Sequence, residues 1–271
     1  MRCTILGGSG FVGRRLARAL RSGGHEVDTP ARGDESIFDR DLGRLFYCTG
    51  MTADFAQRPS ATVEAHAGFL SRLIERATFG HIVYLSSTRL YDSSEAEHGN
   101  ADTKLRLDPR NPRHLYDLSK ALGENLCLTS AGGRSCVARL SGVYDWDDGS
   151  PGFLSEWLQR AAREQAFVMD SASGAVRDYI HLDDVVEALS RLADERAVGI
   201  VNVASGENLS NSEIAGIFNR AGWTIGFTRE TKREALAVCD ISGLHNVGFK
   251  PRKVSEVLAS WIAGAVRRGT D

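Results

Sequence analysis

The 271-residue sequence lacks an excess of charge of either sign, a long apolar run and a paired-cysteine motif. Its formal net charge is −2 and its basic residues are scattered, so nothing in it points to a nucleic-acid partner. No segment approaches the roughly 18–20 apolar residues that span a bilayer. The five cysteines include no C-x-x-C pair and their count is odd, which favours free buried thiols. Neither histidine nor cysteine has the spacing of metal ligands, so we expect no metal site.

The first ten residues, MRCTILGGSG, are typical of a strand that runs into a glycine turn. They contain no long apolar core of a signal peptide, so we expect a cytoplasmic protein. With 42% hydrophobic and 25% charged residues, the composition is that of an ordinary globular protein. A chain of this length accommodates one large α/β domain, with or without a small appendage.

Short apolar runs alternate with helical patterns in the first half of the chain. Strands are predicted at residues 2–6, 25–31, 45–48, 81–86 and 135–140, and helices at 11–22, 61–77 and 115–129. This alternation predicts a parallel sheet with helices on both faces. The pattern loosens after Val143. The later elements are predicted helices at 152–164, 183–194, 211–221 and 253–266, and strands ending at 180 and 203.

Three glycines occupy the turn between the first predicted strand and helix. Gly7, Gly10 and Gly13 form a G-x-x-G-x-x-G pattern. Glycine allows a sharp turn and a close approach of the backbone to a pyrophosphate, whose charge sits at the helix N-terminus. The strand–turn–helix context favours this interpretation over a glycine turn needed only for packing. We therefore predict a dinucleotide site that includes Phe11 and Val12.

The residues after the second predicted strand bear on the choice of cofactor. Ala31 occupies the position at which an acidic residue would bind a ribose 2′-hydroxyl. Arg32 follows, and an arginine can pair with a 2′-phosphate. We therefore expect NADP rather than NAD, with a solvated surface arginine as the alternative.

Two further patterns carry polar chemistry. Tyr116 and Lys120 lie four residues apart on a predicted helix, so they share one face about 5–6 Å apart. A neighbouring ammonium lowers a tyrosine pKa, which makes Tyr116 a candidate general acid or base. Ser86, Ser87 and Thr88 end a predicted strand, at the edge where α/β sheets bind ligands. A hydroxyl there can stabilise developing charge, although such residues also commonly end strands.

Together these patterns resemble the extended short-chain dehydrogenase/reductase family, also called the NAD-dependent epimerase/dehydratase family. Residues 85–91, LSSTRLY, resemble the family's Ser-Ser-x-x-x-Tyr strand end, and residues 109–120 its Pro-x-x-x-Tyr-Gly-x-Ser-Lys segment. Residues 177–185, RDYIHLDDV, are close to a family hallmark, and residues 202–206, 240–242 and 248–251 resemble later parts. The match covers nearly the whole chain.

The resemblance implies a Rossmann-type, doubly wound parallel sheet with a small C-terminal lobe that binds substrate. We expect residues 1–142 with 175–205 to form the NAD(P)-binding domain. Residues 143–174 with 206–271 would then form the small substrate-binding lobe.

The resemblance also implies roles for individual residues. The nicotinamide exchanges a hydride with a substrate carbon and Tyr116 moves the matching proton. Lys120 tunes Tyr116 and holds the nicotinamide ribose, and Ser87 orients the substrate oxygen. Thr49 and Gly50 follow the third predicted strand, where the family contacts its cofactor.

Position 177 meets a substrate diphosphate in some relatives of this family. Arg177 is therefore a candidate substrate-binding residue, with an ion pair to Asp178 or Asp183 as the alternative. We interpret His181 as a packed strand residue.

Several positions depart from the family pattern. Asp117 replaces the glycine that follows the tyrosine. Gly142 replaces an asparagine that touches substrate in many sugar-nucleotide enzymes, and Ala65 an asparagine that supports the proton relay. Residues 33–43 are too few for a full strand–helix–strand, so one β-α unit is trimmed. The cofactor half of the site is therefore better predicted than the substrate half.

The leading functional hypothesis is an oxidoreductase or epimerase that acts on a nucleotide-linked sugar, by 4-keto reduction or epimerisation. One alternative is a reductase of a non-sugar carbonyl compound in specialised metabolism, which the glycine at 142 favours. Another is a non-catalytic NADP-sensing protein, against which the retained Ser87, Tyr116 and Lys120 argue. The leucines of helix 115–129 cannot all face the sheet, so either burial or a homodimer contact accounts for them.

Overall fold

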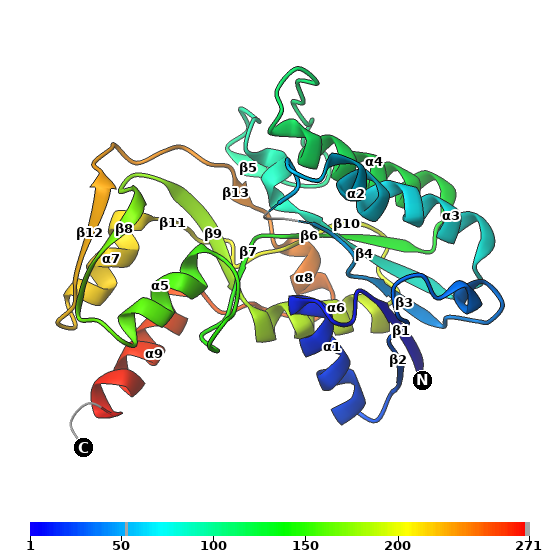
Figure 1. Cartoon of the computed structure of the whole chain (residues 1–271), viewed down its shortest axis with the longest axis horizontal. Helices are drawn as coiled ribbons and strands as arrows, with labels where there is room; N and C mark the ends of the chain where they lie inside the picture. The colour runs from blue at the N-terminus through cyan, green and yellow to red at the C-terminus, as the bar shows by residue number, and fades with distance from the viewer. Residues whose placement is uncertain (52–53, 269–271) are drawn as a thin grey trace.

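The computed structural model describes residues 1–51 and 54–268, and its centre is a six-stranded parallel sheet (Figure 1). The strand order is β10-β6-β4-β3-β1-β2. The strands are β1 (Arg2–Leu6), β2 (Glu26–Asp28), β3 (Arg44–Tyr47), β4 (His81–Ser87), β6 (Ser135–Leu140) and β10 (Gly199–Val203). Central strands β4 and β6 are almost entirely buried, as apolar runs covered on both faces should be. The predicted parallel sheet is confirmed.

Helices cover both faces of this sheet (Figure 1). One face carries α1 (Phe11–Ser22), α6 (Leu182–Asp194) and α8 (Ser242–Asn246), and the other carries α2 (Pro59–Val63), α3 (Phe69–Arg76) and α4 (His114–Ser130). Leu16 and Leu189 pack beneath the first face, whereas Leu73 and Cys127 pack against the second. This layering is the doubly wound architecture that the alternating pattern predicted.

One β-α unit is missing, as the short segment 33–43 predicted. Between β2 and β3 the chain forms only a 3-10 turn, η1 (Glu35–Phe38). As a result β3 pairs directly with β1, with Ile5 beside Phe46. The strand order therefore reverses between β1 and β3. Ligands of open α/β sheets bind outside the carboxyl ends of the strands at such a reversal, so the crevice is expected there.

The C-terminal lobe has its own aromatic core. It consists of α5 (Phe153–Ala161), α7 (Asn211–Asn219), α9 (Val254–Arg268) and a sheet of β8 (Ala166–Ala172) and β12 (Thr224–Arg229) (Figure 1). Trp157, Phe218 and Trp223 pack together in this core. The sequence patterns did not predict β8 or β12.

Two small sheets accompany the large one. The first consists of β7 (Gly142–Tyr144), β9 (Val176–His181) and β11 (Asn208–Ser210), and the second of β5 (His98–Gly99) and β13 (Val238–Cys239). Strand β9, which we assigned to the NAD(P)-binding domain, pairs with β7 and β11 rather than with the large sheet. The domain boundaries themselves stay a prediction.

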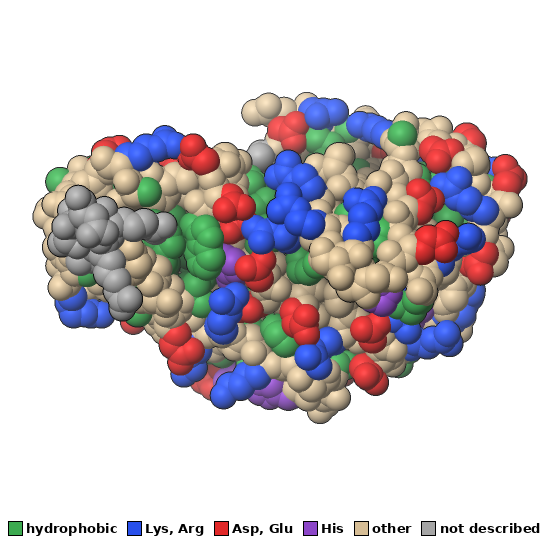
Figure 2. Space-filling model, turned by 90° about the horizontal axis from the view of Figure 1, so that it is seen from below, with side chains coloured by type: hydrophobic (Ala, Val, Ile, Leu, Met, Phe, Trp, Pro, Cys, Tyr) green, Lys and Arg blue, Asp and Glu red, His purple; other side chains and the backbone are tan. Residues whose placement is uncertain are grey.

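The surface and the helix lengths add two observations. Within residues 1–51 and 54–268, no helix is both long enough and apolar enough to cross a membrane. Basic and acidic side chains are interspersed over the face that Figure 2 shows.

A buried polar network fixes α4 against the sheet. The guanidinium of Arg139 on β6 donates to both carboxylate oxygens of Glu124 on α4, at 2.8 and 2.6 Å. Ser86 donates to the same carboxylate at 2.5 Å. Arg139 also donates to the hydroxyl of Tyr91, which in turn donates to Asn202 on β10. The network therefore links α4 to β4, β6 and β10.

Breaking this network should destabilise the fold strongly. In Glu124→Ala the Arg139 charge stays buried without its partner, which costs about 3–5 kcal/mol of unfolding free energy. Urea denaturation measures the loss. Glu187→Ala, which removes an exposed partner of Arg191, is the matched control and should cost at most about 1 kcal/mol. Equal losses in the two variants would contradict a structural role for the network.

Candidate active site

The glycine turn between β1 and α1 is held close to the end of β3. Gly7 has a φ of +82°, and a Cβ there would lie 2.9 Å from the carbonyl group of Cys48. A Cβ on Gly13 would lie 2.3 Å from the carbonyl oxygen of Gly7. Only glycine satisfies both contacts, so the turn closes tightly at the point where the strand order reverses.

The start of α1 fits a phosphate group. Gly10 is the N-cap residue and offers no side chain to the helix, and the first turn has no acidic residue. The amides of Phe11 and Val12 therefore meet no side-chain cap, and the helix dipole favours an anion there. The geometry is compatible with an anion at the predicted residues, and the pyrophosphate site stays a prediction.

The end of β2 lies beside this turn. The Thr29 side chain lies 2.7 Å from the Cβ that a side chain on Gly8 would place there. Arg32 follows in the next turn and is exposed to solvent. Asp28 is engaged in an ion pair of 2.7 Å with Arg40. Arg32 therefore comes three residues after Thr29, the residue that approaches the glycine turn.

The loop after β3 meets Lys120. A Cβ on Gly50 would lie 3.5 Å from Lys120 Nζ and 3.5 Å from Nε2 of His66. Thr49 precedes Gly50 in this loop, directly after Cys48. Two candidate cofactor regions, the glycine turn and the loop at 49–50, therefore lie at the same edge of the sheet as Lys120.

Ser87 and Tyr116 lie together at the carboxyl end of β4. The Ser87 Oγ accepts a hydrogen bond of 3.2 Å from the Arg89 amide, and the Ser87 side chain is close enough to Tyr116 to lower the pKa of its hydroxyl. Tyr116 lies in the first turn of α4 and is buried. The structure therefore places the two candidate catalytic residues close to each other.

The charge environment of Tyr116 differs from the predicted one. Burial raises the pKa of Tyr116, and the Ser87 hydrogen bond and the Arg89 guanidinium oppose this rise. The Arg89 guanidinium carbon lies 5.0 Å from the Tyr116 ring centroid. We predicted that Lys120 lowers this pKa, but burial dominates and the cation that acts on the hydroxyl is Arg89. Tyr116 is therefore protonated at neutral pH and can donate a proton.

Lys120 is buried between α4 and β4. Its ammonium donates to the carbonyl oxygen of Leu85 at 2.7 Å and lies 5.0 Å from the Tyr84 ring centroid. Desolvation lowers the Lys120 pKa to about 8, and the Glu124 carboxylate opposes this. A fraction of Lys120 is therefore neutral at slightly alkaline pH.

Arg89 and Asp117 form a pair that the sequence patterns did not reveal. Arg89 Nε lies 3.1 Å from a carboxylate oxygen of Asp117, the residue that replaces the family's glycine. Burial raises the pKa of Asp117, and Arg89 counteracts this. Arg89 also donates to the carbonyl oxygen of Arg113 at 3.0 Å. The substitution at 117 was visible in the sequence, but its partner lies 28 residues earlier on another element.

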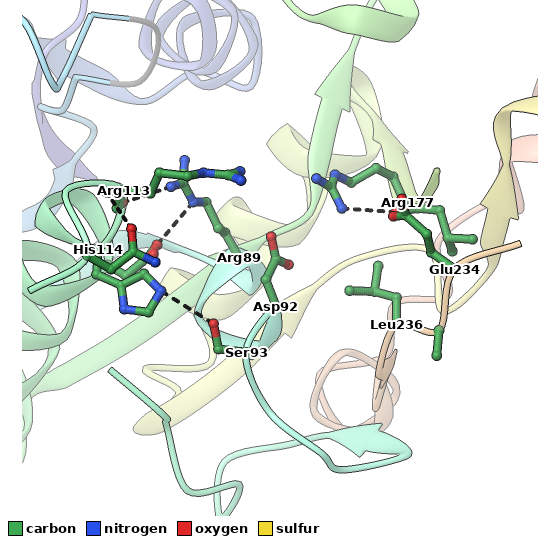
Figure 3. Close-up of a pocket in the computed structure, with 12 residues that line it drawn as sticks. Arg89, Asp92, Ser93, Arg113, His114, Arg177, Glu234 and Leu236 are labelled. Atoms are coloured by element: carbon green, nitrogen blue, oxygen red, sulfur yellow. Dashed lines mark hydrogen bonds and ion pairs between the residues drawn. The ribbon is translucent and has the colours of Figure 1, made fainter. Parts of the chain in front are cut away.

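Ser87 lines a cavity of about 250 Å³, and a second cavity of about 270 Å³ adjoins it. The residues that line both are Arg89, Asp92, Arg113, Arg177 and Leu236. Arg89 and Arg113 enter from one side and Arg177 from the other, with Asp92 between them (Figure 3). The loop at 93–113 contributes Ser93 and Asn111 to the walls.

Arg177 has no ion pair with either predicted alternative partner in the part of the chain that the structure describes. Asp178 accepts hydrogen bonds from Ser205 and Gly206, and Asp183 pairs with Arg15. The Arg177 side chain donates to the Val176 carbonyl oxygen at 3.0 Å. Its guanidinium is therefore left to face the cavity.

The fold and this edge of the sheet define an α/β protein with a tight glycine turn between β1 and α1 and with Ser87, Tyr116 and Lys120 at the neighbouring strand ends. The chain belongs to the NAD dependent epimerase/dehydratase family, which it matches over residues 45–204. The predicted family is confirmed, and the protein is an NAD(P)-dependent enzyme of the extended short-chain dehydrogenase/reductase type.

Individual relatives are distant. UDP-glucuronic acid decarboxylase 1 of Danio rerio is 23% identical over 78% of this chain and 57% of its own length. The dTDP-4-dehydro-6-deoxy-D-allose reductase of a Streptomyces species is 23% identical over 79% of this chain and 78% of its own. The structure of MoeE5 in complex with UDP-glucose and NAD superposes with a TM-score of 0.79 at 20% identity, over the full length of both chains. The chain thus spans little more than half of the Danio rerio relative.

The lowered pKa of Lys120 predicts a pH dependence of stability. Because the unfolded lysine binds its proton more tightly than the folded one, wild-type stability gains from Lys120 as pH rises between about 8 and 10.5. Lys120→Met lacks this contribution. The unfolding free energy of the wild type should therefore rise relative to that of Lys120→Met by up to roughly 3 kcal/mol across that range.

Urea titrations of both proteins at several pH values measure this difference. Buried tyrosines and cysteines that do not interact with Lys120 titrate alike in the two proteins, so their effects cancel; Cys48 and Cys127 do interact with it and are replaced by serine in both proteins. A difference that does not change with pH would show that Lys120 keeps an ordinary pKa.

Proposed function

We propose that this protein oxidises or reduces a nucleotide-linked sugar, by 4-keto reduction or epimerisation, with Ser87, Tyr116 and Lys120 as its catalytic residues. The observation that carries the proposal is the proximity of Ser87 and Tyr116 beside a cavity that three arginines border. Among the relatives, a decarboxylase and a 4-dehydro-sugar reductase are named for nucleotide sugars, and MoeE5 binds UDP-glucose.

The cofactor would lie along the edge where the strand order reverses. The amides of Phe11 and Val12, with Gly7, Gly10 and Gly13, would hold its pyrophosphate. Thr49, Gly50 and Lys120 would contact the nicotinamide half. When bound, the nicotinamide supplies or accepts the hydride.

The chain's own residues supply the proton chemistry. Tyr116 is protonated at neutral pH, so it donates a proton to the oxygen of a carbonyl that is being reduced, or takes one back in the reverse direction. The Ser87 hydroxyl orients the same oxygen. After Tyr116 has donated its proton it is a phenolate. Arg89 stabilises this phenolate, because the Arg89 guanidinium carbon lies 5.0 Å from the ring centroid.

The arginines of the cavity are suited to bind the diphosphate of a nucleotide sugar. Arg177 faces the cavity from β9, and Arg113 faces it from the opposite side (Figure 3). Guanidinium groups bind phosphate oxygens through paired, charge-assisted hydrogen bonds. We assign the diphosphate of the substrate to Arg177.

One observation favours the alternative, a reductase of a non-sugar carbonyl compound. A Cβ on Gly142 would lie 2.8 Å from the Tyr179 ring and 3.1 Å from the carbonyl oxygen of Asp178. An asparagine at this position therefore has no room without movement of the Tyr179 ring. The contact that many sugar-nucleotide enzymes make from it is missing here. A non-catalytic NADP-sensing role is disfavoured by the proximity of Ser87 and Tyr116.

The absorbance of reduced nicotinamide tests the reaction. NADPH or NADH is mixed with the protein and a panel of nucleotide-linked 4-keto sugars and simple ketones, and product mixtures with nucleotide sugars are examined for epimers. Consumption of cofactor or epimer formation with a nucleotide sugar is expected. Turnover of simple ketones alone would move the assignment to the alternative function.

Tyr116→Phe should abolish turnover and leave cofactor binding within about twofold, because it removes only the proton-transferring hydroxyl. Tyr144→Phe is the matched control, since it removes a buried hydroxyl in the lobe away from the pocket. Cofactor affinity is measured by fluorescence titration and turnover by absorbance. Full activity of the Tyr116→Phe protein would exclude the proposed mechanism.

Arg32 is our proposed determinant of NADP over NAD. Replacing it with alanine should weaken NADPH binding about tenfold and leave NADH binding unchanged, because only NADPH carries the 2′-phosphate. Arg220→Ala, at an exposed position after α7, serves as the control. If the two dissociation constants of the Arg32→Ala protein match those of the wild type, the assignment of NADP fails.

We also infer a cytoplasmic protein that pairs through α4. The support for pairing is the apolar exposed side of this helix, where Leu122 is 50% exposed and Leu128 39%. Both inferences stay predictions.

A further inference from the structure

His66 is a fully buried histidine beside the catalytic helix that no sequence pattern singled out. It follows Ala65, the residue in the place of the family's asparagine. The predicted continuous helix 61–77 is interrupted here by one π-helical turn, η2 (Glu64–Gly68). Such turns shift the side chains that follow them, and they occur frequently at functional sites.

The hydrogen bonds of His66 fix its tautomer. Its Nε2 accepts from the Met51 backbone amide at 3.1 Å, so Nε2 carries no proton. Its Nδ1 lies 2.8 Å from Ser119 Oγ. Ser119 donates its own hydrogen to the Tyr116 carbonyl oxygen at 2.9 Å, which leaves Nδ1 as the donor to Ser119. A directed chain therefore runs from Met51 through His66 and Ser119 to the backbone of Tyr116.

The surroundings of the π turn are built to keep His66 in place. The carbonyl oxygens of Ala65 and His66 accept hydrogen bonds from the hydroxyls of Tyr47 and Tyr84. Gly123 allows this approach, because a Cβ there would lie 2.6 Å from the His66 carbonyl oxygen and 2.2 Å from the Tyr84 hydroxyl. The polar groups around the turn are therefore satisfied by β3 and β4 rather than by solvent.

We propose that His66 is a positioning residue that couples the cofactor loop at 49–51 to the helix bearing Tyr116 and Lys120. Its ring crosses the space between them, 5.2 Å from the Tyr116 ring centroid and at right angles to it. One ring nitrogen bonds to the loop at Met51 and the other bonds to Ser119 on α4. Movement of either element is therefore transmitted to the other.

The same geometry excludes His66 as a proton-transfer group. Both ring nitrogens are already engaged, Nε2 by the Met51 amide and Nδ1 by the Ser119 hydroxyl. Burial lowers the His66 pKa to about 3, and the nearby Lys120 ammonium lowers it further in the same direction. His66 is therefore neutral at physiological pH and acts by orientation.

Nitrogen NMR of the imidazole rings tests the tautomer without any substrate. Among the seven histidines, the His66 signal is assigned by its loss in His66→Gln. We expect the Nδ1–H tautomer and no titration between about pH 5 and 8. A His66 ring that titrates with an ordinary pKa, or that is protonated at Nε2, would overturn the proposal.

Two substitutions separate the two halves of the coupling. The amide nitrogen of His66→Asn reproduces the Nδ1 donor to Ser119 but leaves the Met51 amide without its acceptor. The amide oxygen of His66→Gln reproduces the Nε2 acceptor but leaves Ser119 without its donor. Loss of one buried hydrogen bond corresponds to an effect of about five- to tenfold.

We expect His66→Asn to weaken cofactor binding about five- to tenfold, and His66→Gln to keep cofactor affinity within about twofold while lowering kcat five- to tenfold. Ser119→Ala should lower kcat as His66→Gln does, and the double variant should be no worse than either single variant. His81→Gln is the control, since His81 is equally buried at the other end of β4 and bonds to Ala197.

If Asn and Gln at position 66 lower cofactor affinity and kcat together, or if His81→Gln does the same, the role of His66 is merely structural and the proposal is wrong. The kcat arm rests on the proposed function. The NMR measurement and the cofactor-binding measurement do not rest on it. They therefore still test the role of His66 if the nucleotide-sugar hypothesis fails.

Discussion

The buried ammonium of Lys120, held on the carbonyl oxygen of Leu85, is the contact on which the rest of the site depends. It anchors α4 to the end of β4 and so brings Tyr116 to Ser87. It also fills the space against Gly50, at the edge where the strand order reverses. Burying this charge is costly, as its lowered pKa shows. The fold offsets that cost with the Leu85 carbonyl, the Tyr84 ring and the nearby Glu124 carboxylate.

The charges around the site follow from the same constraint. Glu124 is shared between the Lys120 environment and the buried Arg139, so one carboxylate stabilises two cations on α4 and β6. Burial raises the pKa of Tyr116 by more than the nearby Arg89 lowers it, so Tyr116 stays protonated. Arg89 is in turn held by Asp117. The result is a proton donor, a buried cation and a paired arginine within one turn of helix and one strand end.

The sequence predicted those parts of the fold that depend on local patterns. The glycine turn, the apolar central strands and the four-residue spacing of Tyr116 and Lys120 are encoded by neighbouring residues. Strand β2 ends before its predicted limit because Pro30 has no amide for the ladder. Strands β8 and β12 escaped prediction because Asp170 and Gly226 weaken their strand character and their pairing joins distant segments. The Arg89–Asp117 pair, the π turn and the His66 chain arise only from tertiary packing.

A crystal structure of the protein with bound NADPH tests the central claim most directly, because it locates the cofactor relative to Lys120. The account predicts the pyrophosphate on the amides that open α1 and the nicotinamide ribose within hydrogen-bond distance of Lys120 Nζ. The nicotinamide should then face the Ser87 and Tyr116 hydroxyls. A cofactor bound with its ribose away from Lys120, or outside the edge between β1 and β3, would contradict it.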